Sequence, residues 1–238
     1  MNFNNKFRLI ISQNLSSKVN SNIDKALFKN FVNSQNPILR IYSWEDSLTF
    51  GAGQNIEDFS ELKNRYQNNV SKRLTGGGVL FHGHDISYTI LLSPNQIENK
   101  DVKETYFLIC QFLIKFYENL GLKAHFAKDD ENIILSKSPF CQIGFEAYDI
   151  IIDGKKIGGN AQKRAKFCIL QHGSIPLFSK SSNDFLGSSL QDFGINIGFI
   201  EAKDSLIKAF KETFEVEFIN DDLDENEKNI LKNLEEEN

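Results

Sequence analysis

An arginine, a threonine and three glycines stand together in the segment Arg73-Leu74-Thr75-Gly76-Gly77-Gly78. Consecutive glycines let the backbone turn sharply and let a ligand approach the chain closely. Their N–H groups can bind an anion or a carbonyl oxygen, and Arg73 adds a fixed positive charge. The segment therefore indicates a binding loop, although a flexible turn between two strands would use the same residues.

Cys141 is the candidate nucleophile among the three cysteines of the chain. Cys110 lies in an apolar stretch of helical period and Cys168 in an apolar strand, so both are predicted to be core residues. Cys141 instead lies in the proline-containing segment Ser138-Pro139-Phe140-Cys141-Gln142, which is typical of a loop. A reactive thiol needs partial exposure and a nearby positive charge, and Lys156, after a strand and a turn, is the expected source.

Two lysines, Lys155 and Lys156, follow a predicted turn and precede Gly158 and Gly159. A lysine that enters a glycine-bordered strand can point into a cleft and act there as a cation or a hydrogen-bond donor. A solvated pair on a hairpin is the other interpretation, and it is the one we prefer for Lys155.

The four histidines are His82, His84, His125 and His172, and their spacing matches no metal-binding motif. His82 follows the glycines, and His172 lies in a Gln-His-Gly segment. We predict that these two brace a binding pocket and that the protein has no metal site. A nucleophilic His–Cys pair is the alternative.

Composition excludes several classes of protein. A net charge of −5 and a pI near 5.5 do not fit a nucleic-acid binder, and no apolar run approaches the roughly 20 residues that span a bilayer. An odd number of cysteines without a CxxC pair argues against a disulfide framework or a zinc site. We therefore expect no nucleic-acid or membrane partner, and a reduced, cytoplasmic location.

Apolar periodicity predicts how these residues are positioned. Strands are expected at 7–12, 38–43, 48–50, 79–81, 86–92, 147–152, 156–157 and 167–170. Helices are expected at 21–33, 102–120, 203–214 and 224–237, with a weaker one at 57–68. This order predicts an α/β or α+β fold with one mixed central sheet flanked by helices. A single domain would occupy residues 1–220, and a charged helical tail residues 221–238.

Three segments resemble motifs of the biotin/lipoate protein ligase catalytic family. The glycine segment followed by His82 resembles its RxTGGG…H motif. The segment Lys156-Ile157-Gly158-Gly159-Asn160-Ala161-Gln162 resembles K-[IV]-x-G-x-A-Q, and Leu170-Gln171-His172-Gly173-Ser174-Ile175 resembles L-x-HG-[ST]-[IL]. The resemblance implies the family's catalytic fold. Its site residues would then bind substrate at Arg73, Gly76, Gly77, Gly78, His82, Gly159, Ala161, His172 and Gly173.

Two further segments extend the match to roughly residues 7–215. Residues 40–44, Arg-Ile-Tyr-Ser-Trp, resemble the family's early strand, and residues 22–24, Asn-Ile-Asp, its first helix. Two positions depart from the pattern. Gly83 replaces the aspartate that commonly follows the motif histidine, and Gly158 replaces a small serine or alanine, a change expected to be benign.

Within the family, Phe140-Cys141 upstream of Lys156 resembles octanoyltransferases of the LipM type, which carry a nucleophilic cysteine on that loop. The resemblance implies transfer of an octanoyl group from acyl carrier protein to a lysine of a lipoyl domain, as a step of lipoate biosynthesis. The acceptor would be glycine cleavage H protein or a 2-oxoacid dehydrogenase E2. Catalytic Cys141 would form an acyl-enzyme, catalytic Lys156 would favour its thiolate, and no cofactor would be required. Carrier docking is expected at Lys163, Arg164 and Lys166 from their clustered charge.

Three alternatives stay open. An ATP-dependent lipoate ligase would use ATP and Mg²⁺, hold an acyl-adenylate with Lys156 and the glycines, and not need Cys141. An amidotransferase would move a lipoyl or octanoyl group between lipoyl domains and share the cysteine. A non-enzymatic member of the fold would only bind acyl groups or a partner.

Overall fold

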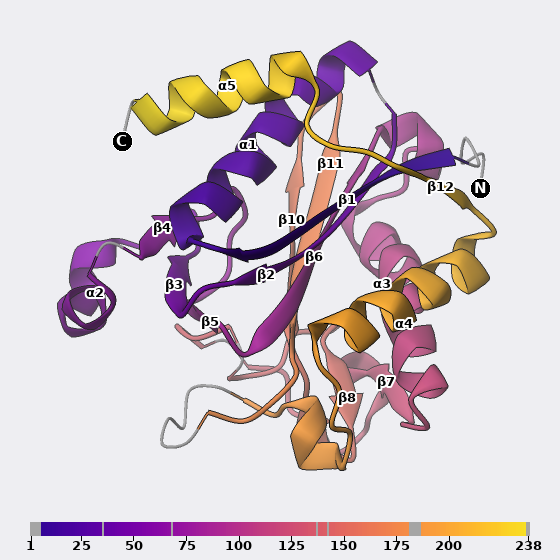
Figure 1. The fold of residues 1–238 in the computed structure, drawn as a ribbon. Coiled ribbons are helices and arrows are strands. Elements are labelled where there is room, and N and C mark those ends of the chain that lie inside the picture. The colour runs from indigo at the N-terminus through magenta and orange to yellow at the C-terminus, as the bar shows by residue number, and fades with distance from the viewer. Residues whose placement is uncertain are drawn as a thin grey trace.

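The computed structural model describes residues 6–34, 36–67, 69–136, 138–141, 143–180 and 187–236. A six-stranded sheet forms its centre, in the order β10-β11-β6-β2-β1-β12 (Figure 1). β1 pairs in parallel with both β2 and β12, and the remaining neighbours pair antiparallel, so the sheet is mixed as predicted. Its strands are β1 (Lys6–Leu15), β2 (Ile38–Trp44), β6 (Asp85–Leu92), β10 (Gly159–Arg164), β11 (Ile169–Pro176) and β12 (Glu217–Asn220).

Two three-stranded sheets carry the candidate functional loops. One has the order β4-β3-β5, and the glycine loop connects β4 to β5. The other has the order β7-β8-β9; Lys156 lies on β9, and the chain between β7 and β8 contains Cys141. The strands are β3 (Ser47–Phe50), β4 (Val70–Lys72), β5 (Leu80–His82), β7 (Ala124–Phe126), β8 (Ile150–Ile152) and β9 (Lys155–Lys156).

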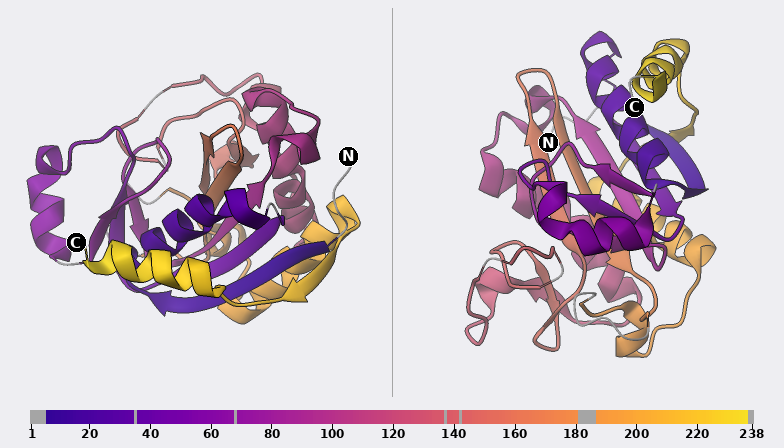
Figure 2. Two further views of the ribbon diagram at one scale, coloured as in Figure 1. Left: turned by 90° about the horizontal axis from the view of Figure 1, so that it is seen from above. Right: turned by 90° about the vertical axis from the view of Figure 1, so that its left-hand side faces the viewer.

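Helices cover both faces of the central sheet, because alternate strand residues enter two different cores. Leu9 packs in the core that contains α3 and α4, and Ile10 packs in the core that contains α1. α3 packs against α4, and α5 lies alongside α1 (Figures 1 and 2). The helices are α1 (Ser17–Ser34), α2 (Ser60–Tyr66), α3 (Val102–Asn119), α4 (Phe199–Phe214) and α5 (Glu225–Glu236). Short 3₁₀ turns are η1 (Ile56–Phe59), η2 (Pro94–Ile97), η3 (Ala127–Asp129) and η4 (Leu190–Phe193).

α3 begins and ends where its sequence directs. Asp101 accepts a hydrogen bond from the N–H of Glu104 at 2.8 Å, and Glu104 accepts one from the N–H of Asp101 at 2.9 Å. This reciprocal capping satisfies two N–H groups that the helix leaves unpaired. Gly121 follows the helix with φ +82°, the left-handed conformation that the predicted glycine cap requires. None of the helices in the described ranges is long and apolar enough to cross a bilayer.

The helices and most long strands lie where periodicity predicts them. The strand predicted at 167–170 is β11, which runs instead from Ile169 to Pro176, and the other errors concern short or polar strands. The strand predicted at 147–152 covers only Ile150–Ile152, and β4, β7 and β12 were not predicted. β10, with the sequence Gly-Asn-Ala-Gln-Lys-Arg, was also missed as a strand, because it has no apolar alternation. Its pairing with β11 supplies the hydrogen bonds that the sequence pattern cannot reveal.

The C-terminal helix is tied to the sheet by a buried ion pair. Two guanidinium nitrogens of Arg8 donate to the carboxylate of Glu227 at 2.8 and 2.9 Å, and Asp221 accepts a third bond at 2.6 Å. Glu227 is 1% exposed. The boundary placed after residue 220 stays a prediction, but the residues beyond it pack on the main body.

Candidate active site

Two cavities meet at Cys141. The inner one is a narrow slot of about 20 Å³, and its walls include Tyr42, Trp44 and Leu80. The outer one is wider, about 350 Å³, and its walls include Lys156. Both are lined by Cys141, Gly159 and Asn160. The thiol therefore lines both an apolar slot and a polar cavity.

Backbone hydrogen bonds hold the Cys141 loop against Val79, the residue that follows the glycine loop. The N–H of Cys141 donates to the carbonyl of Val79 at 3.0 Å, and the N–H of Val79 donates to the carbonyl of Pro139 at 2.8 Å. The N–H of Gly78 then donates to Cys141 Sγ at 3.1 Å, and an Arg73 guanidinium nitrogen lies 3.7 Å from the same sulfur. Two donors from the glycine segment thus converge on the candidate nucleophile.

The glycines allow this close approach. Gly77 has φ +93°, and a Cβ there would lie 2.9 Å from Cys141 Sγ. A Cβ on Gly78 would lie 2.3 Å from the carbonyl oxygen of Pro139. Gly76 has nothing within 4 Å of its Cβ position, so only the second and third glycines are required by packing. Substrate binding by Gly76, Gly77 and Gly78 stays a prediction.

Lys156 is 9% exposed and paired with a carboxylate that the sequence analysis missed. Its Nζ lies 2.6 Å from Asp149 Oδ2 and donates to the carbonyl of Gly144 at 3.2 Å. Burial raises the pKa of Asp149, and the charge of Lys156 opposes that rise. The ammonium group is thus held by Asp149, whereas the described polar contacts of the thiol come from Arg73 and Gly78. A lone acidic residue directly before the apolar strand β8 was the available signal for Asp149. Lys155 is exposed, as predicted.

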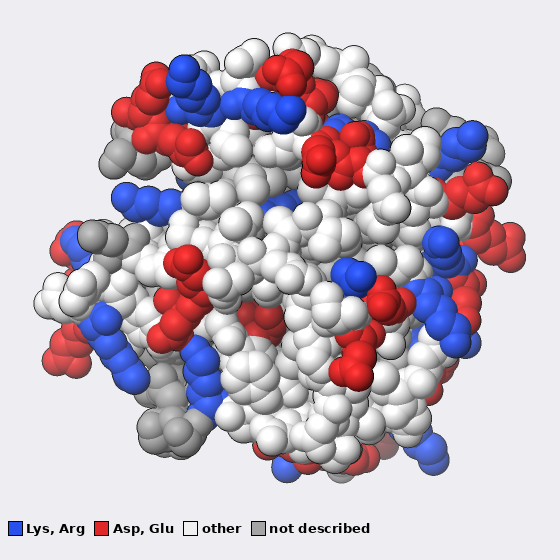
Figure 3. Space-filling view, in the orientation of Figure 1, with Lys and Arg blue, Asp and Glu red and all other residues white. Residues whose placement is uncertain are grey.

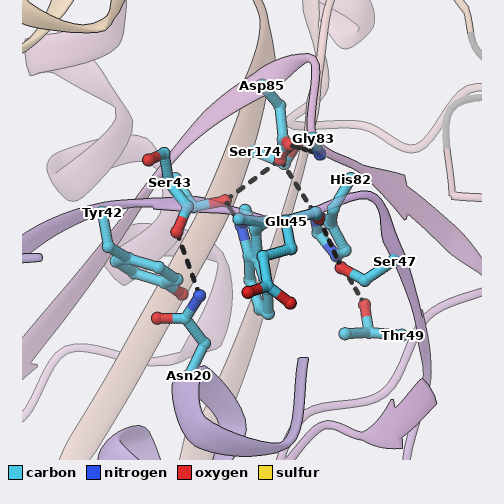
Figure 4. A network of polar contacts seen from close by, with 12 residues as sticks. Asn20, Tyr42, Ser43, Glu45, Ser47, Thr49, His82, Gly83, Asp85 and Ser174 are labelled. Atoms are coloured by element: carbon cyan, nitrogen blue, oxygen red, sulfur yellow. Dashed lines mark hydrogen bonds and ion pairs between the residues drawn. The ribbon is translucent and has the colours of Figure 1, made fainter. Parts of the chain in front are cut away.

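His82 lies at the centre of a buried network (Figure 4). Its Nδ1 is 2.9 Å from Asp85 Oδ2, and its Nε2 is 2.8 Å from Thr49 Oγ1. The Trp44 ring stacks on the imidazole at a centroid distance of 3.9 Å. Burial would raise the pKa of Asp85, but His82 and a hydrogen bond from Ser174 outweigh it and lower the pKa to about 2. The network fixes the ring that forms one wall of the inner slot.

His172 anchors the start of the glycine loop. Its Nε2 lies 2.6 Å from Thr75 Oγ1, and its Nδ1 lies 3.5 Å from Asp24 Oδ2. Arg40 donates to the other oxygen of Asp24 at 2.8 Å. Burial lowers the pKa of His172 although Asp24 opposes the shift. The described hydrogen bonds of His82 and His172 go to these partners, so the alternative His–Cys pair is not formed.

The remaining motif residues shape the slot. Gly159, Ala161 and Gly173 line it, and a Cβ on Gly173 would lie 2.2 Å from Asn160 Oδ1. That oxygen accepts a hydrogen bond from Tyr88 at 2.7 Å. Asn160 was missed as a wall residue because it lies within the polar strand β10.

Both departures from the family pattern have a local explanation. Gly83 has φ +93°, and a Cβ there would lie 2.9 Å from Asp46 Cα, so this turn requires glycine. Asp85 supplies the carboxylate that binds His82 instead. Gly158 has φ +73°, and its Cβ would lie 2.2 Å from the carbonyl oxygen of Ser174. Glycine is therefore well accommodated at position 158 of this chain, whereas a serine or alanine there would meet that oxygen.

The other two cysteines are core residues, as predicted. Cys110 and Cys168 are both 0% exposed. Burial raises the pKa of the Cys110 thiol to about 12 and also raises the pKa of Cys168. Within the described ranges, no group of three or more histidine, cysteine or carboxylate side chains is placed to hold a metal ion.

Comparison with known proteins identifies the family. The model of the lipoyl protein ligase A/B catalytic domain matches residues 16–192. The chain belongs to this family. Octanoyltransferase LipM of Clostridioides difficile (strain 630) is 28% identical over 97% of this chain and 95% of its own length. Octanoyltransferase LipM of Bacillus subtilis (strain 168) is 34% identical, over 72% of this chain and 65% of its own length.

Solved structures of lipoate protein ligases share the fold. A putative lipoate protein ligase from T. acidophilum has a TM-score of 0.79 and 22% identity, covering 98% of this chain and 95% of its own. A lipoate-protein ligase A bound with ATP has a TM-score of 0.77 and 22% identity, covering 96% and 94%. The predicted family and fold are thereby confirmed.

Proposed function

We propose that this protein is an octanoyltransferase of lipoate biosynthesis that works through an acyl-enzyme on Cys141. The observation that carries the proposal is the position of the Cys141 thiol, where slot and outer cavity meet and where Arg73 and Gly78 donate toward the sulfur. Relatives named octanoyltransferase LipM support the same activity. The donor is an octanoyl thioester of acyl carrier protein, and the acceptor is a lipoyl-domain lysine of glycine cleavage H protein or a 2-oxoacid dehydrogenase E2.

In the first step, the Cys141 thiolate attacks the carbonyl carbon of the octanoyl thioester. A carbon–sulfur bond to Cys141 forms, the bond to the carrier sulfur breaks, and the carrier thiolate takes up a proton. The outer cavity receives the carrier's thiol arm, and the acyl chain enters between Tyr42, Trp44 and Leu80. At about 20 Å³ the slot must widen to admit the chain. Lys156, fixed by Asp149, is the donor available to the carbonyl oxygen from the outer cavity.

In the second step, the neutral amine of the acceptor lysine attacks the acyl-enzyme. An amide bond forms, the carbon–sulfur bond to Cys141 breaks, and the lysine nitrogen loses a proton to solvent. The thioester is already activated, so the transfer needs no ATP.

The experiment is intact-mass analysis of the protein after mixing with octanoyl-carrier protein. We expect one octanoyl adduct, carried by the peptide that contains Cys141, removable by hydroxylamine as a thioester is. Cys141→Ala should give no adduct, and octanoyl transfer to a lipoyl domain should stop. An undiminished adduct in Cys141→Ala would refute the proposal.

An ATP-dependent lipoate ligase is the second candidate, because the fold neighbours include a ligase bound with ATP and the outer cavity holds Lys156. Lipoate, ATP, Mg²⁺ and an apo lipoyl domain are added, and AMP is measured, because an acyl-adenylate releases AMP only when the acceptor lysine takes the acyl group. We expect no AMP release; release that persists in Cys141→Ala would establish the ligase instead.

An amidotransferase would also use Cys141 but would take its acyl group from another lipoyl domain. Supplying an octanoylated lipoyl domain in place of octanoyl-carrier protein distinguishes the two donors. One solved neighbour is a bipartite lipoate protein ligase with its E2 lipoyl domain from Thermoplasma acidophilum, at a TM-score of 0.75.

The carrier docking residues stay a proposal. Lys163 and Lys166 are exposed, whereas Arg164 donates to the carbonyl of Lys100 at 2.7 Å and to Thr105 Oγ1 at 3.0 Å. On the face seen in Figure 3, basic and acidic side chains are interspersed rather than gathered by sign. We therefore assign docking to Lys163 and Lys166, and a structural role to Arg164.

A further inference from the structure

The burial of Arg73 differs from that of two other buried arginines. Arg8 is paired with Glu227 and Asp221, and Arg40 with Asp24. Arg73 is only 6% exposed, yet among the described residues no carboxylate lies within ion-pair distance of it. An unpaired buried charge is strongly unfavourable, so an anion is expected beside this guanidinium in the functional state.

The hydrogen bonds of Arg73 leave one ionisable neighbour. One terminal nitrogen donates to the carbonyl of Thr49 at 2.9 Å and to its Oγ1 at 2.7 Å. The other donates to the carbonyl of Gly78 at 2.6 Å and lies 3.7 Å from Cys141 Sγ. The first three acceptors are neutral oxygens, so the sulfur of Cys141 is the contacted atom that can become an anion.

A buried chain of hydrogen bonds holds the guanidinium in place. Because Arg73 can only donate, Thr49 Oγ1 accepts from it and is free to donate its own proton to His82 Nε2, 2.8 Å away. His82 Nδ1–H then donates to Asp85 at 2.9 Å. The terminal nitrogens of Arg73, the Thr49 hydroxyl and the His82 ring thus form a chain of donors from the nucleophile to a buried carboxylate, whereas the Nε–H of Arg73 has no acceptor among the described residues.

We propose that Arg73 is a catalytic residue, the counter-cation of the Cys141 thiolate, and that Thr49, His82 and Asp85 are the residues that position it. The inference rests on the proposed function only for the use to which the thiolate is put. The thiol proton leaves to solvent through the outer cavity, the sulfur keeps the electron pair, and Arg73 together with the N–H of Gly78 stabilises the resulting anion. Lys156 is then free to act on the carbonyl oxygen rather than on the thiol.

The test is the rate at which Cys141 is alkylated at neutral pH by iodoacetamide, followed by peptide mass analysis. The reagent is uncharged, so loss of a positive charge acts through the thiolate and not through attraction of the reagent. Arg73→Gln should lower the alkylation rate about tenfold or more. Arg73→Lys should lower it less, because lysine keeps the positive charge but lacks the planar guanidinium with its several donors. Lys72→Gln, an exposed change of the same net charge at the adjacent position, should react at the wild-type rate.

If Lys156 rather than Arg73 were the counter-cation of the thiolate, Lys156→Gln rather than Arg73→Gln would slow alkylation. If Lys156→Gln lowers the alkylation rate as much as Arg73→Gln does, or if Arg73→Gln reacts like wild type, the proposal is wrong. A second measurement needs no change at Arg73. The ultraviolet thiolate absorbance of the wild type should exceed that of Cys141→Ser at neutral pH, and equal absorbances would overturn the proposal even if Arg73→Gln does not fold.

These measurements use no acyl substrate, so they are independent of the proposed function. A protein whose alkylation depends on Arg73 but which forms no octanoyl adduct would refute the transferase and retain the ion pair. If the octanoyl adduct forms equally well in wild type and Arg73→Gln, and the alkylation rates are equal, the transferase is supported and the Arg73–Cys141 ion pair is refuted.

Discussion

Gly77 shows how closely individual atoms constrain the candidate nucleophile. Its φ of +93° favours glycine, and its missing Cβ leaves room for Cys141 Sγ at a distance that a methyl group would reduce to 2.9 Å. The two effects can be measured separately, because the positive φ affects the free energy of unfolding and the close contact affects the position of the thiol.

Gly77→Ala should therefore lower octanoyl transfer about a hundredfold or more, since misplacing a reacting atom by about 1 Å costs that much. The free energy of unfolding should fall by only about 1–2 kcal/mol, from the positive φ. Steady-state kinetics and thermal melting measure the two effects. Gly53→Ala, where a Cβ meets nothing within 4 Å, is the control and should retain both properties. Full activity in Gly77→Ala would contradict the described geometry.

Asp85 gives a pH dependence whose sign follows from its depressed pKa of about 2 against a normal 3.8. A group with a lowered folded-state pKa stabilises the fold above its unfolded pKa, and that contribution is lost as the pH falls through the folded value. Asp85→Asn should thus cost about 2 kcal/mol at neutral pH, and the difference from wild type should shrink between about pH 4 and pH 2. Urea unfolding at several pH values measures it; a difference that is constant over this range would be incompatible with the assigned network.

The elements differ in how they hold the site. β10 and β11 form a hairpin at one edge of the central sheet, and the glycine loop is carried by a separate small sheet. The Cys141 loop pairs with Val79 beside the glycine loop, and Cys141 lines both cavities together with Gly159 of β10. α5 lies beside α1 and contributes no residue to the walls of the two cavities. The ion pair between Arg8 of β1 and Glu227 connects it to the central sheet. Its contribution should therefore be to stability.

Glu227→Ala should lower the free energy of unfolding by about 3–5 kcal/mol, because it leaves Arg8 with a buried charge that has lost its main partner. Cys141 alkylation in the folded protein should be unchanged. Chemical denaturation measures the loss, and Glu235→Ala, an exposed change on the same helix, should have little effect. A loss for Glu227→Ala no larger than for Glu235→Ala would show that α5 does not depend on this pair.

The whole molecule sets the accessibility of its three thiols. Cys110 and Cys168 are inside two different cores on opposite faces of the sheet, whereas Cys141 faces both cavities. Folding thus leaves a single thiol open to substrate.

Brief treatment of the native protein with iodoacetamide should accordingly modify Cys141 alone, and the same treatment in urea should modify all three cysteines. Peptide mapping counts the modified sites, with Cys141→Ala as the control that should stay unmodified when native. Native labelling of Cys110 at a rate comparable to Cys141 would show that the core around α3 opens readily.

The sequence by itself determined the residue types that are needed and the long elements that carry them. A cysteine in a polar, proline-containing loop differs from cysteines in apolar periods, and the periodicity of α1, α3 and α4 follows from local burial. It also determined the family, because the glycine, lysine and histidine segments keep their order along the chain. Lys156 and Cys141 line the same cavity, which agrees with the family that these segments predicted.

Only the tertiary structure decided which cation contacts the thiol. Electrostatic stabilisation depends on distances of a few ångströms between groups that are far apart in the chain, and sequence spacing does not give those distances. Thus Lys156 pairs with Asp149, while Arg73 and Gly78 reach Cys141. The same reason explains why Thr49, Asp85 and Asp24 were not predicted, since each acquires its role from a partner on another strand or helix.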